Sequence, residues 1–151
     1  VLPEEYRGLL VGHYPDLADH VVGIRSVYDD TFRFPTAAAL EVMGTANIMT
    51  KFMLPVASAL TDRVRIVGAD GREEDESYFW EHSDVGQYDD DLMNTAFETH
   101  PAFFRDRVYT DYYEQHVETL TEMIEAGEST GVTYESITPS YIPCLDKRKI
   151  G

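Results

Sequence analysis

Short apolar runs alternate along the chain with longer segments in which apolar residues recur every three or four positions. Three runs, residues 20–24, 63–70 and 132–138, have the length and β-branched content of buried strands. Two segments between them, residues 47–60 and 111–129, carry one apolar face at helical spacing. This order predicts an α/β protein with a partial Rossmann-like layered fold. Its mainly parallel sheet would be flanked by helices, because helical crossovers join parallel strands.

Local signals mark irregularities and ends in the two predicted helices. Pro55 has no amide for a helical hydrogen bond, so a kink is expected within residues 47–60. Asp111 and Glu114 have the spacing of a capping pair, and Gly131 is a typical helix terminator. The second helix is therefore expected to have well-defined ends.

Composition narrows the class of protein. A length of 151 residues suffices for one domain with its own core, so residues 1–151 are expected to form a single α/β domain. Acidic residues number 28 against 12 basic ones, and the net charge of −16 argues against nucleic acid as a partner.

No apolar run approaches the roughly 20 residues needed to span a membrane. The lone cysteine, Cys144, excludes an internal disulfide, and we expect a cytoplasmic protein.

The strand predicted at residues 63–70 ends in a group of polar and aromatic residues. Asp70, Gly71 and Arg72 follow its apolar part directly, and Tyr78 comes six positions later. Ligands of open parallel sheets bind beyond the carboxyl ends of the strands. Arg72 and Tyr78 would bind a phosphate there, and Gly71 would allow a backbone turn that other residues resist. A surface turn in which Arg72 pairs with neighbouring acids fits the same residues, so both interpretations stay open.

A second candidate precedes the helix predicted at residues 47–60. Gly44 and Thr45 stand just before this helix, and Asn47 stands at its first position. The unpaired amides and the dipole of a helix N-terminus attract a phosphate or carboxylate, and Thr45 and Asn47 add donors. Ordinary N-capping by Thr45 or Asn47 is the simpler interpretation.

His100 is the candidate for proton transfer. Pro101 biases it away from helical geometry, into a loop before the second helix. A histidine there can accept a proton near neutral pH, although a structural histidine bonded to a backbone carbonyl explains the pattern too. His82 and His116 compete for the role, and His116 is expected to be packed beside the apolar face of the second helix.

Asp89 and Asp91 form an acid-x-acid pair of the kind that holds Mg²⁺ against a diphosphate. A solvated charge run before a helix is the more ordinary origin of such a pair. We therefore assign no metal site and keep Mg²⁺ only as an alternative cofactor. The sequence has no glycine-rich Rossmann or Walker loop and no nucleophile elbow.

Five segments follow one another in an informative order. They are the helix-opening Gly44-Thr45-Ala46-Asn47, the strand end Gly68-Ala69-Asp70, the aromatic segment Ser77-Tyr78-Phe79, the loop with His100 and the final turn Thr138-Pro139-Ser140. In order and spacing, over about residues 44–148, they resemble the C-terminal half of bacterial sialyltransferases that act on lipooligosaccharide. The chain also looks like the related flagellin-modifying glycosyltransferases and the archaeal hydroxymethylpterin diphosphokinase-like proteins.

The resemblance implies transfer of a sugar from a nucleotide-activated donor to a carbohydrate or other hydroxyl acceptor, as in polysaccharide biosynthesis. In that family tyrosines hold the phosphate of the leaving nucleotide and a loop histidine is the general base. On this chain those roles fall to Tyr78 and His100, and Arg72 stands near the position of a further family tyrosine. The expected donor site comprises Gly44, Thr45, Asn47, Asp70, Gly71, Arg72 and Tyr78, around one cavity.

The chain departs from this family at its N-terminal side. Residues 1–43 contain no nucleotide-binding glycine loop, so the chain is expected either to be the C-terminal part of a larger domain or to have a different site. A fragment would leave a sheet edge unpaired and favour homo-oligomers. Two other functions stay open. One is an ATP- and Mg²⁺-dependent pyrophosphokinase with Asp70, Asp89 and Asp91 as ligands, and the other is a non-catalytic binding or assembly module that retains the fold.

Overall fold

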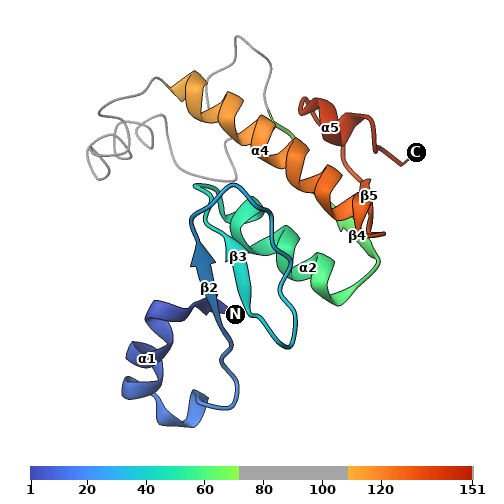
Figure 1. Ribbon diagram of the computed structural model, residues 1–151. Coiled ribbons are helices and arrows are strands. Elements are labelled where there is room, and N and C mark those ends of the chain that lie inside the picture. Colours follow the sequence, from blue (N-terminus) through green and yellow to red (C-terminus); the bar gives the residue numbers. More distant parts are fainter. Residues whose placement is uncertain (72–108, 151) are drawn as a thin grey trace, which may run out of the picture. The chain divides into compact units, whose positions relative to one another are not determined.

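The computed structural model describes residues 1–71 and 109–150 (Figure 1). The chain divides into two compact units, Val1–Arg65 with Thr119–Glu135 and Ile66–Glu118 with Ser136–Gly151. The division passes through β4 (Arg63–Ile66), α4 (Tyr109–Ser129) and β5 (Thr133–Ser136). Each unit has its own buried side chains.

The first unit contains a three-stranded parallel sheet in the order β1-β2-β3. β1 (Leu2–Pro3) pairs with the start of β2 (Gly23–Val27), and β3 (Glu41–Met43) pairs with the rest of it. α1 (Glu4–His13) makes the crossover from β1 to β2 and packs against β2, and a short 3-10 turn, η1 (Pro15–Leu17), follows α1 (Figure 1). A parallel pair needs such a crossover, because a tight hairpin can join only antiparallel strands.

The segment predicted as one kinked helix over residues 47–60 consists of two elements. A π-helix, η2 (Met49–Met53), leads directly into α2 (Leu54–Leu60), and the amide of Leu54 bonds to the carbonyl of Met49, five residues back. Pro55 lies in the first turn of α2, and because η2 runs into α2 without a break, its missing amide interrupts the helical hydrogen bonds where the two elements join. The irregularity therefore precedes Pro55 instead of bending a single α-helix at it.

The second sheet consists of β4 and β5. The amide of Thr133 donates to the carbonyl of Asp62, and the amide of Ile137 donates to the carbonyl of Ile66, both at 2.8 Å. From one bond to the next, both strands advance in the same direction, so the pair is parallel. α4 leads into β5, and a short helix, α5 (Pro143–Asp146), follows it.

Apolar side chains fill the interior of both units. α4 supplies Leu120, Met123 and Ile124 to the first unit, each no more than 1% exposed, and their spacing is that of one helix face. The other buried apolar side chains of the first unit are those of Ile24, Pro35, Val42, Leu54, Pro55, Val64, Val132 and Tyr134. Those of the second unit are Ile66, Ile142, Cys144 and Leu145.

The structure confirms an α/β class with parallel strands packed against helices. The described strands form two sheets, however, where the sequence predicted one. The strand predicted at residues 20–24 lies three positions later, as β2, because the polar Arg25 and Ser26 pair with β3. The sequence did not predict β1, α1, β3 or α5. None of the described helices is both long and apolar enough to cross a membrane.

Candidate functional site

The predicted site residues fall into three groups. Asp70 and Gly71 belong to the second unit, whereas Gly44, Thr45 and Asn47 belong to the first. The remaining candidates lie outside the described residues: Arg72, Tyr78, Asp89, Asp91 and His100, together with the competing His82. The cavity expected around all of the donor-site residues therefore stays a prediction.

The loops that follow β4 and β5 meet where these two parallel strands end. The amide of Gly68 donates to Oγ1 of Thr138 at 3.0 Å, and this hydroxyl donates in turn to Oδ1 of Asp70 at 3.2 Å. A threonine hydroxyl has one proton to give and lone pairs to accept with, so it can make both bonds at once. Thr138 therefore fixes the Asp70 carboxylate beside the backbone of its own loop.

A second set of bonds fixes the backbone on either side of Asp70. Ser140 Oγ lies 2.7 Å from the carbonyl oxygen of Ala69 and 3.2 Å from that of Asp70, and it accepts the amide of Ile142 at 3.1 Å. The amide of Tyr141 donates to the carbonyl of Asp70 at 2.6 Å. We refer to Gly68, Ala69, Asp70, Gly71, Thr138 and Ser140 as the Asp70 cluster.

Two glycines allow the chain to turn within this cluster. Gly68 and Gly71 have φ values of +71° and +70°, in the left-handed region that side chains disfavour. The structure thus confirms the unusual backbone predicted at Gly71. A Cβ atom on Gly71 would lie 2.7 Å from Cγ1 of Ile142 and 2.8 Å from the hydroxyl of Tyr113, so Gly71 is also needed for close packing.

The residues before η2 form the local contacts expected of a helix cap. Oδ1 of Asn47 accepts the amide of Met49 at 2.8 Å, which is the N-capping interaction. Oγ1 of Thr45 lies 2.8 Å from Oγ1 of the buried Thr50 and 3.2 Å from the carbonyl oxygen of Asn47. These contacts support the capping interpretation, and a phosphate-binding role for Thr45 and Asn47 stays a prediction.

Tyr28 and Gly44 adjoin one another where β2 and β3 end. The amide of Gly44 donates to the carbonyl of Val27 at 2.8 Å and extends the pairing of the two strands. A Cβ atom on Gly44 would lie only 2.5 Å from Cδ1 and 3.0 Å from Cζ of Tyr28, so one side of the Tyr28 ring packs on this glycine. Sequence reasoning missed Tyr28, and the available signal was an aromatic residue four positions after the strand predicted at residues 20–24.

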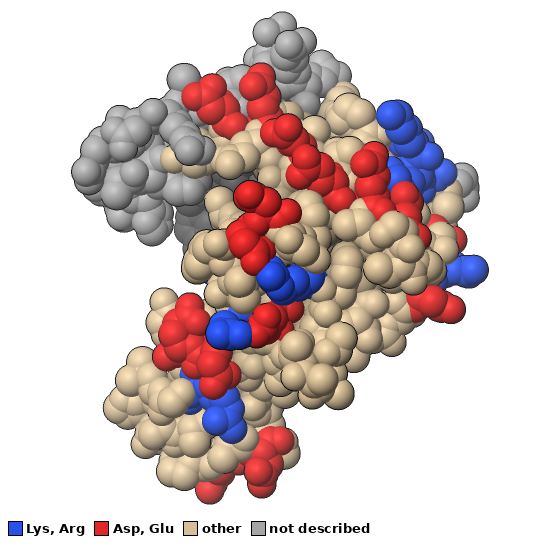
Figure 2. Space-filling view, viewed as in Figure 1, with Lys and Arg blue, Asp and Glu red and all other residues tan. Residues whose placement is uncertain are grey.

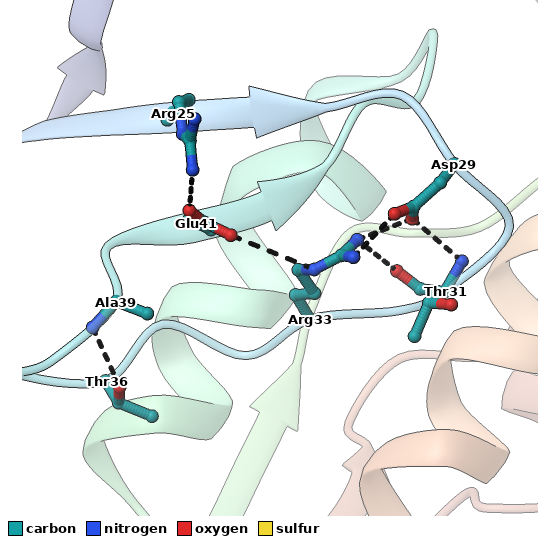
Figure 3. Close-up of polar contacts among 7 residues, drawn as sticks. All are labelled: Arg25, Asp29, Thr31, Arg33, Thr36, Ala39 and Glu41. Carbon is teal, nitrogen blue, oxygen red and sulfur yellow. Dashed lines mark hydrogen bonds and ion pairs between the residues drawn. The ribbon is translucent and has the colours of Figure 1, made fainter.

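Ion pairs hold the connection between β2 and β3 (Figure 3). Arg33 binds both carboxylate oxygens of Asp29 at 2.5 Å and lies 3.9 Å from Glu41, which also pairs with Arg25. The amide of Thr31 donates to Asp29 Oδ1 at 3.1 Å. The hydrogen bond from Arg33 lowers the pKa of Asp29, and the same contact raises the pKa of Arg33. Two-pronged arginine–carboxylate pairing is specific in geometry, so it orders the backbone that follows Tyr28.

Surface charge and the available side chains limit which ligands the described loops can bind. Acidic side chains spread over the face seen in Figure 2, with basic ones interspersed among them. An anionic ligand therefore needs local compensation. Within residues 1–71 and 109–150, no group of three or more His, Cys, Asp or Glu side chains could hold a metal ion. Asp70 supplies one carboxylate, which suits hydrogen bonds to hydroxyl groups.

No family model, curated protein or solved structure matches the chain.

Proposed function

We propose that this chain is a glycosyltransferase-like domain that transfers a sugar from a nucleotide-activated donor to a hydroxyl acceptor. The Asp70 cluster is the observation that supports this function. It places an oriented carboxylate where two neighbouring parallel strands end, which is where α/β sheets bind ligands. A carboxylate accepts hydrogen bonds through two oxygens, so it suits the paired hydroxyls of a ribose or a sugar.

Thr138 preorganises this carboxylate for binding. Because the Thr138 hydroxyl already donates to Oδ1 of Asp70, the carboxylate is held in one orientation before a ligand arrives. A preorganised acceptor loses little side-chain entropy on binding, and a hydrogen bond to a charged group contributes about 1.5–3 kcal/mol. In this proposal Asp70 binds the neutral, hydroxyl-bearing part of the donor and leaves the phosphate to cationic and phenolic groups.

The chemical step falls to residues outside those described. His100 takes the proton of the acceptor hydroxyl, the oxygen attacks the anomeric carbon, and the bond from that carbon to the phosphate oxygen breaks. Arg72 and Tyr78 stabilise the nucleotide phosphate as it leaves. General base catalysis of this kind typically contributes about 10²–10⁴ in rate. His100→Ala should therefore lose most turnover while keeping the wild-type melting temperature.

Calorimetric titration with CMP-, UDP- and GDP-linked sugars and with ATP, each with and without Mg²⁺, tests the proposal. The wild-type chain should bind at least one of them, and Asp70→Asn should weaken that binding by about tenfold or more. Asp19→Asn is the matched control, since Asp19 is an exposed carboxylate in the first unit. Equal affinities of Asp70→Asn and wild type would remove Asp70 from the site. Binding of ATP with Mg²⁺, and of no sugar nucleotide, would favour the pyrophosphokinase instead.

A further inference from the structure

Tyr28 is held at the ends of two parallel strands but is not covered. Tyr28 directly follows β2, and one side of its ring lies against Gly44, the residue that directly follows β3. The residue is nevertheless 79% exposed, the second-highest exposure among the large apolar and aromatic residues described. The contact with Gly44 covers one side of the ring, and the high exposure of Tyr28 leaves the opposite side available to a ligand.

The surroundings of Tyr28 keep its position defined. The bond from the Gly44 amide to the Val27 carbonyl fixes the two strand ends, and the Arg33–Asp29 pair fixes the loop that begins after Tyr28 (Figure 3). Gly44 also lacks the Cβ atom that would push the ring away. An exposed ring on a fixed backbone loses less freedom on binding than one on an unrestrained loop.

We propose that Tyr28, resting on Gly44, is a stacking platform for the planar base of a nucleotide. This inference rests on the proposed use of nucleotides by the chain, and it is argued from the first unit alone, which contains both Tyr28 and Gly44. A base has a neutral aromatic face, so it can stack on a tyrosine even on a strongly acidic protein. Stacking of a base on an aromatic side chain is worth about 1–3 kcal/mol, which corresponds to about a 5- to 150-fold change in affinity.

The neighbours of Tyr28 favour a nucleotide over an apolar partner. Asp29, Thr31 and Arg33 follow it in the same loop, interleaved with Phe32 and Phe34. An apolar docking surface would need a continuous patch of exposed apolar side chains. An exposed aromatic ring that is followed in the chain by polar residues instead suits a ligand that combines a flat base with a polar sugar.

Binding of nucleoside 5′-monophosphates tests the platform without requiring sugar transfer. The cytidine, uridine, guanosine and adenosine monophosphates are titrated calorimetrically into the full chain, and ribose 5-phosphate serves as a probe without a base. At least one monophosphate should bind wild type more tightly than ribose 5-phosphate does. Tyr28→Ala should weaken that binding about 5- to 150-fold, Tyr28→Phe should retain it, and ribose 5-phosphate should not distinguish the variants.

Two further variants separate stacking from general effects. Gly44→Ala should weaken monophosphate binding as well, because the new Cβ would displace the ring. Tyr14→Ala is the control, since Tyr14 is 61% exposed and lies outside the β2 and β3 ends, and it should bind like wild type. Equal binding by Tyr28→Ala and wild type, or an equal loss in Tyr14→Ala, would overturn the platform.

The failures of the two proposals can be told apart. If Asp70→Asn loses sugar-nucleotide binding while Tyr28→Ala does not, the platform fails and the proposed function stands. If the monophosphates bind through Tyr28 but no sugar is transferred to any acceptor, the proposed function fails and the platform stands. If no monophosphate binds wild type more tightly than ribose 5-phosphate, the platform fails whatever the transfer assay gives.

Discussion

The hydroxyl of Tyr134 lies 2.6 Å from Oγ of Ser58 and joins β5 to α2 within the first unit. Ser58 also donates its proton to the carbonyl of Leu54 at 2.7 Å. Because a serine hydroxyl has only one proton, Tyr134 must be the donor in the contact between the two side chains. Burial raises the pKa of Tyr134, and the carboxylate of Glu128 adds to the rise, so the phenol keeps this proton at physiological pH.

Tyr134→Phe should lower the free energy of unfolding by about 1 kcal/mol. The substitution keeps the ring in the core and removes only the donor, and a hydrogen bond typically contributes that amount. Urea denaturation measures the change. Tyr14→Phe is the matched control, because Tyr14 is exposed and its variant should stay within about 0.5 kcal/mol of wild type. Equal stability of the two variants would show that the bond between Tyr134 and Ser58 contributes nothing.

Gly127→Ala should destabilise the chain although it places a better helix former in α4. A Cβ atom on Gly127 would lie 2.7 Å from Cζ and 2.8 Å from Cε2 of Tyr134, and both residues are buried. The intrinsic gain of about 1 kcal/mol for alanine over glycine in a helix should therefore be outweighed by a steric cost of about 1–3 kcal/mol. Thermal and urea unfolding should both show lower stability than wild type.

Gly8→Ala is the control for the predicted direction of the stability change in Gly127→Ala. Gly8 lies within α1, and a Cβ atom there would meet nothing within 4 Å. Only the helix propensity remains, so Gly8→Ala should stabilise the chain by about 0.5–1 kcal/mol. Stabilisation by both substitutions would mean that Gly127 does not pack closely against Tyr134.

Strong local patterns account for the parts of the fold that could be predicted. The apolar stripe through Leu120 and Ile124 identifies α4, and the β-branched run at residues 63–70 identifies β4. Gly71 could be assigned a special backbone because only a few residue types tolerate a left-handed turn. Each of these features depends on residues close together in sequence, which is why the sequence alone reveals them.

The missed features depend on contacts between distant segments. β3 has only three residues, and its strand character comes from pairing with Arg25 through Val27. The bond between Thr138 and Asp70 joins residues 68 positions apart, and no local pattern reports it. The contact of Tyr28 with Gly44 likewise follows from the register of β2 and β3. Register sets which side chains meet, and short strands with mixed polarity specify it only weakly in sequence.

A comparison of two glycines with the same backbone conformation separates strain from packing in the Asp70 cluster. Gly68→Ala and Gly71→Ala both place a side chain at φ of about +70°. Gly68 has open space around it, so the free energy of unfolding of Gly68→Ala should fall only by the cost of backbone strain, about 1 kcal/mol. Gly71→Ala must also displace Ile142 and Tyr113, so its free energy of unfolding should fall by at least about 1 kcal/mol more. Urea unfolding measures both changes. Equal losses would place Gly71 in open space as well.

His116 should make the chain sensitive to mild acid. Its Nδ1 atom is buried, with no hydrogen-bond partner in the described structure, and burial lowers the pKa of the imidazole below its ordinary value of about 6.5. The unfolded chain therefore binds a proton more readily than the folded one. The contribution of His116 to stability is fully present above about pH 6.5 and is lost as the pH falls from there through the lowered pKa.

His116→Gln removes this titration, so its free energy of unfolding should fall less than that of wild type between about pH 7 and pH 5. Urea unfolding at several pH values measures how steeply the free energy of unfolding changes with pH in each protein. The contribution of the carboxylates is the same in both proteins, so it drops out of the difference between the two slopes. A His116→Gln variant with the wild-type slope would mean that the imidazole is solvated in solution, because burial is what lowers its pKa.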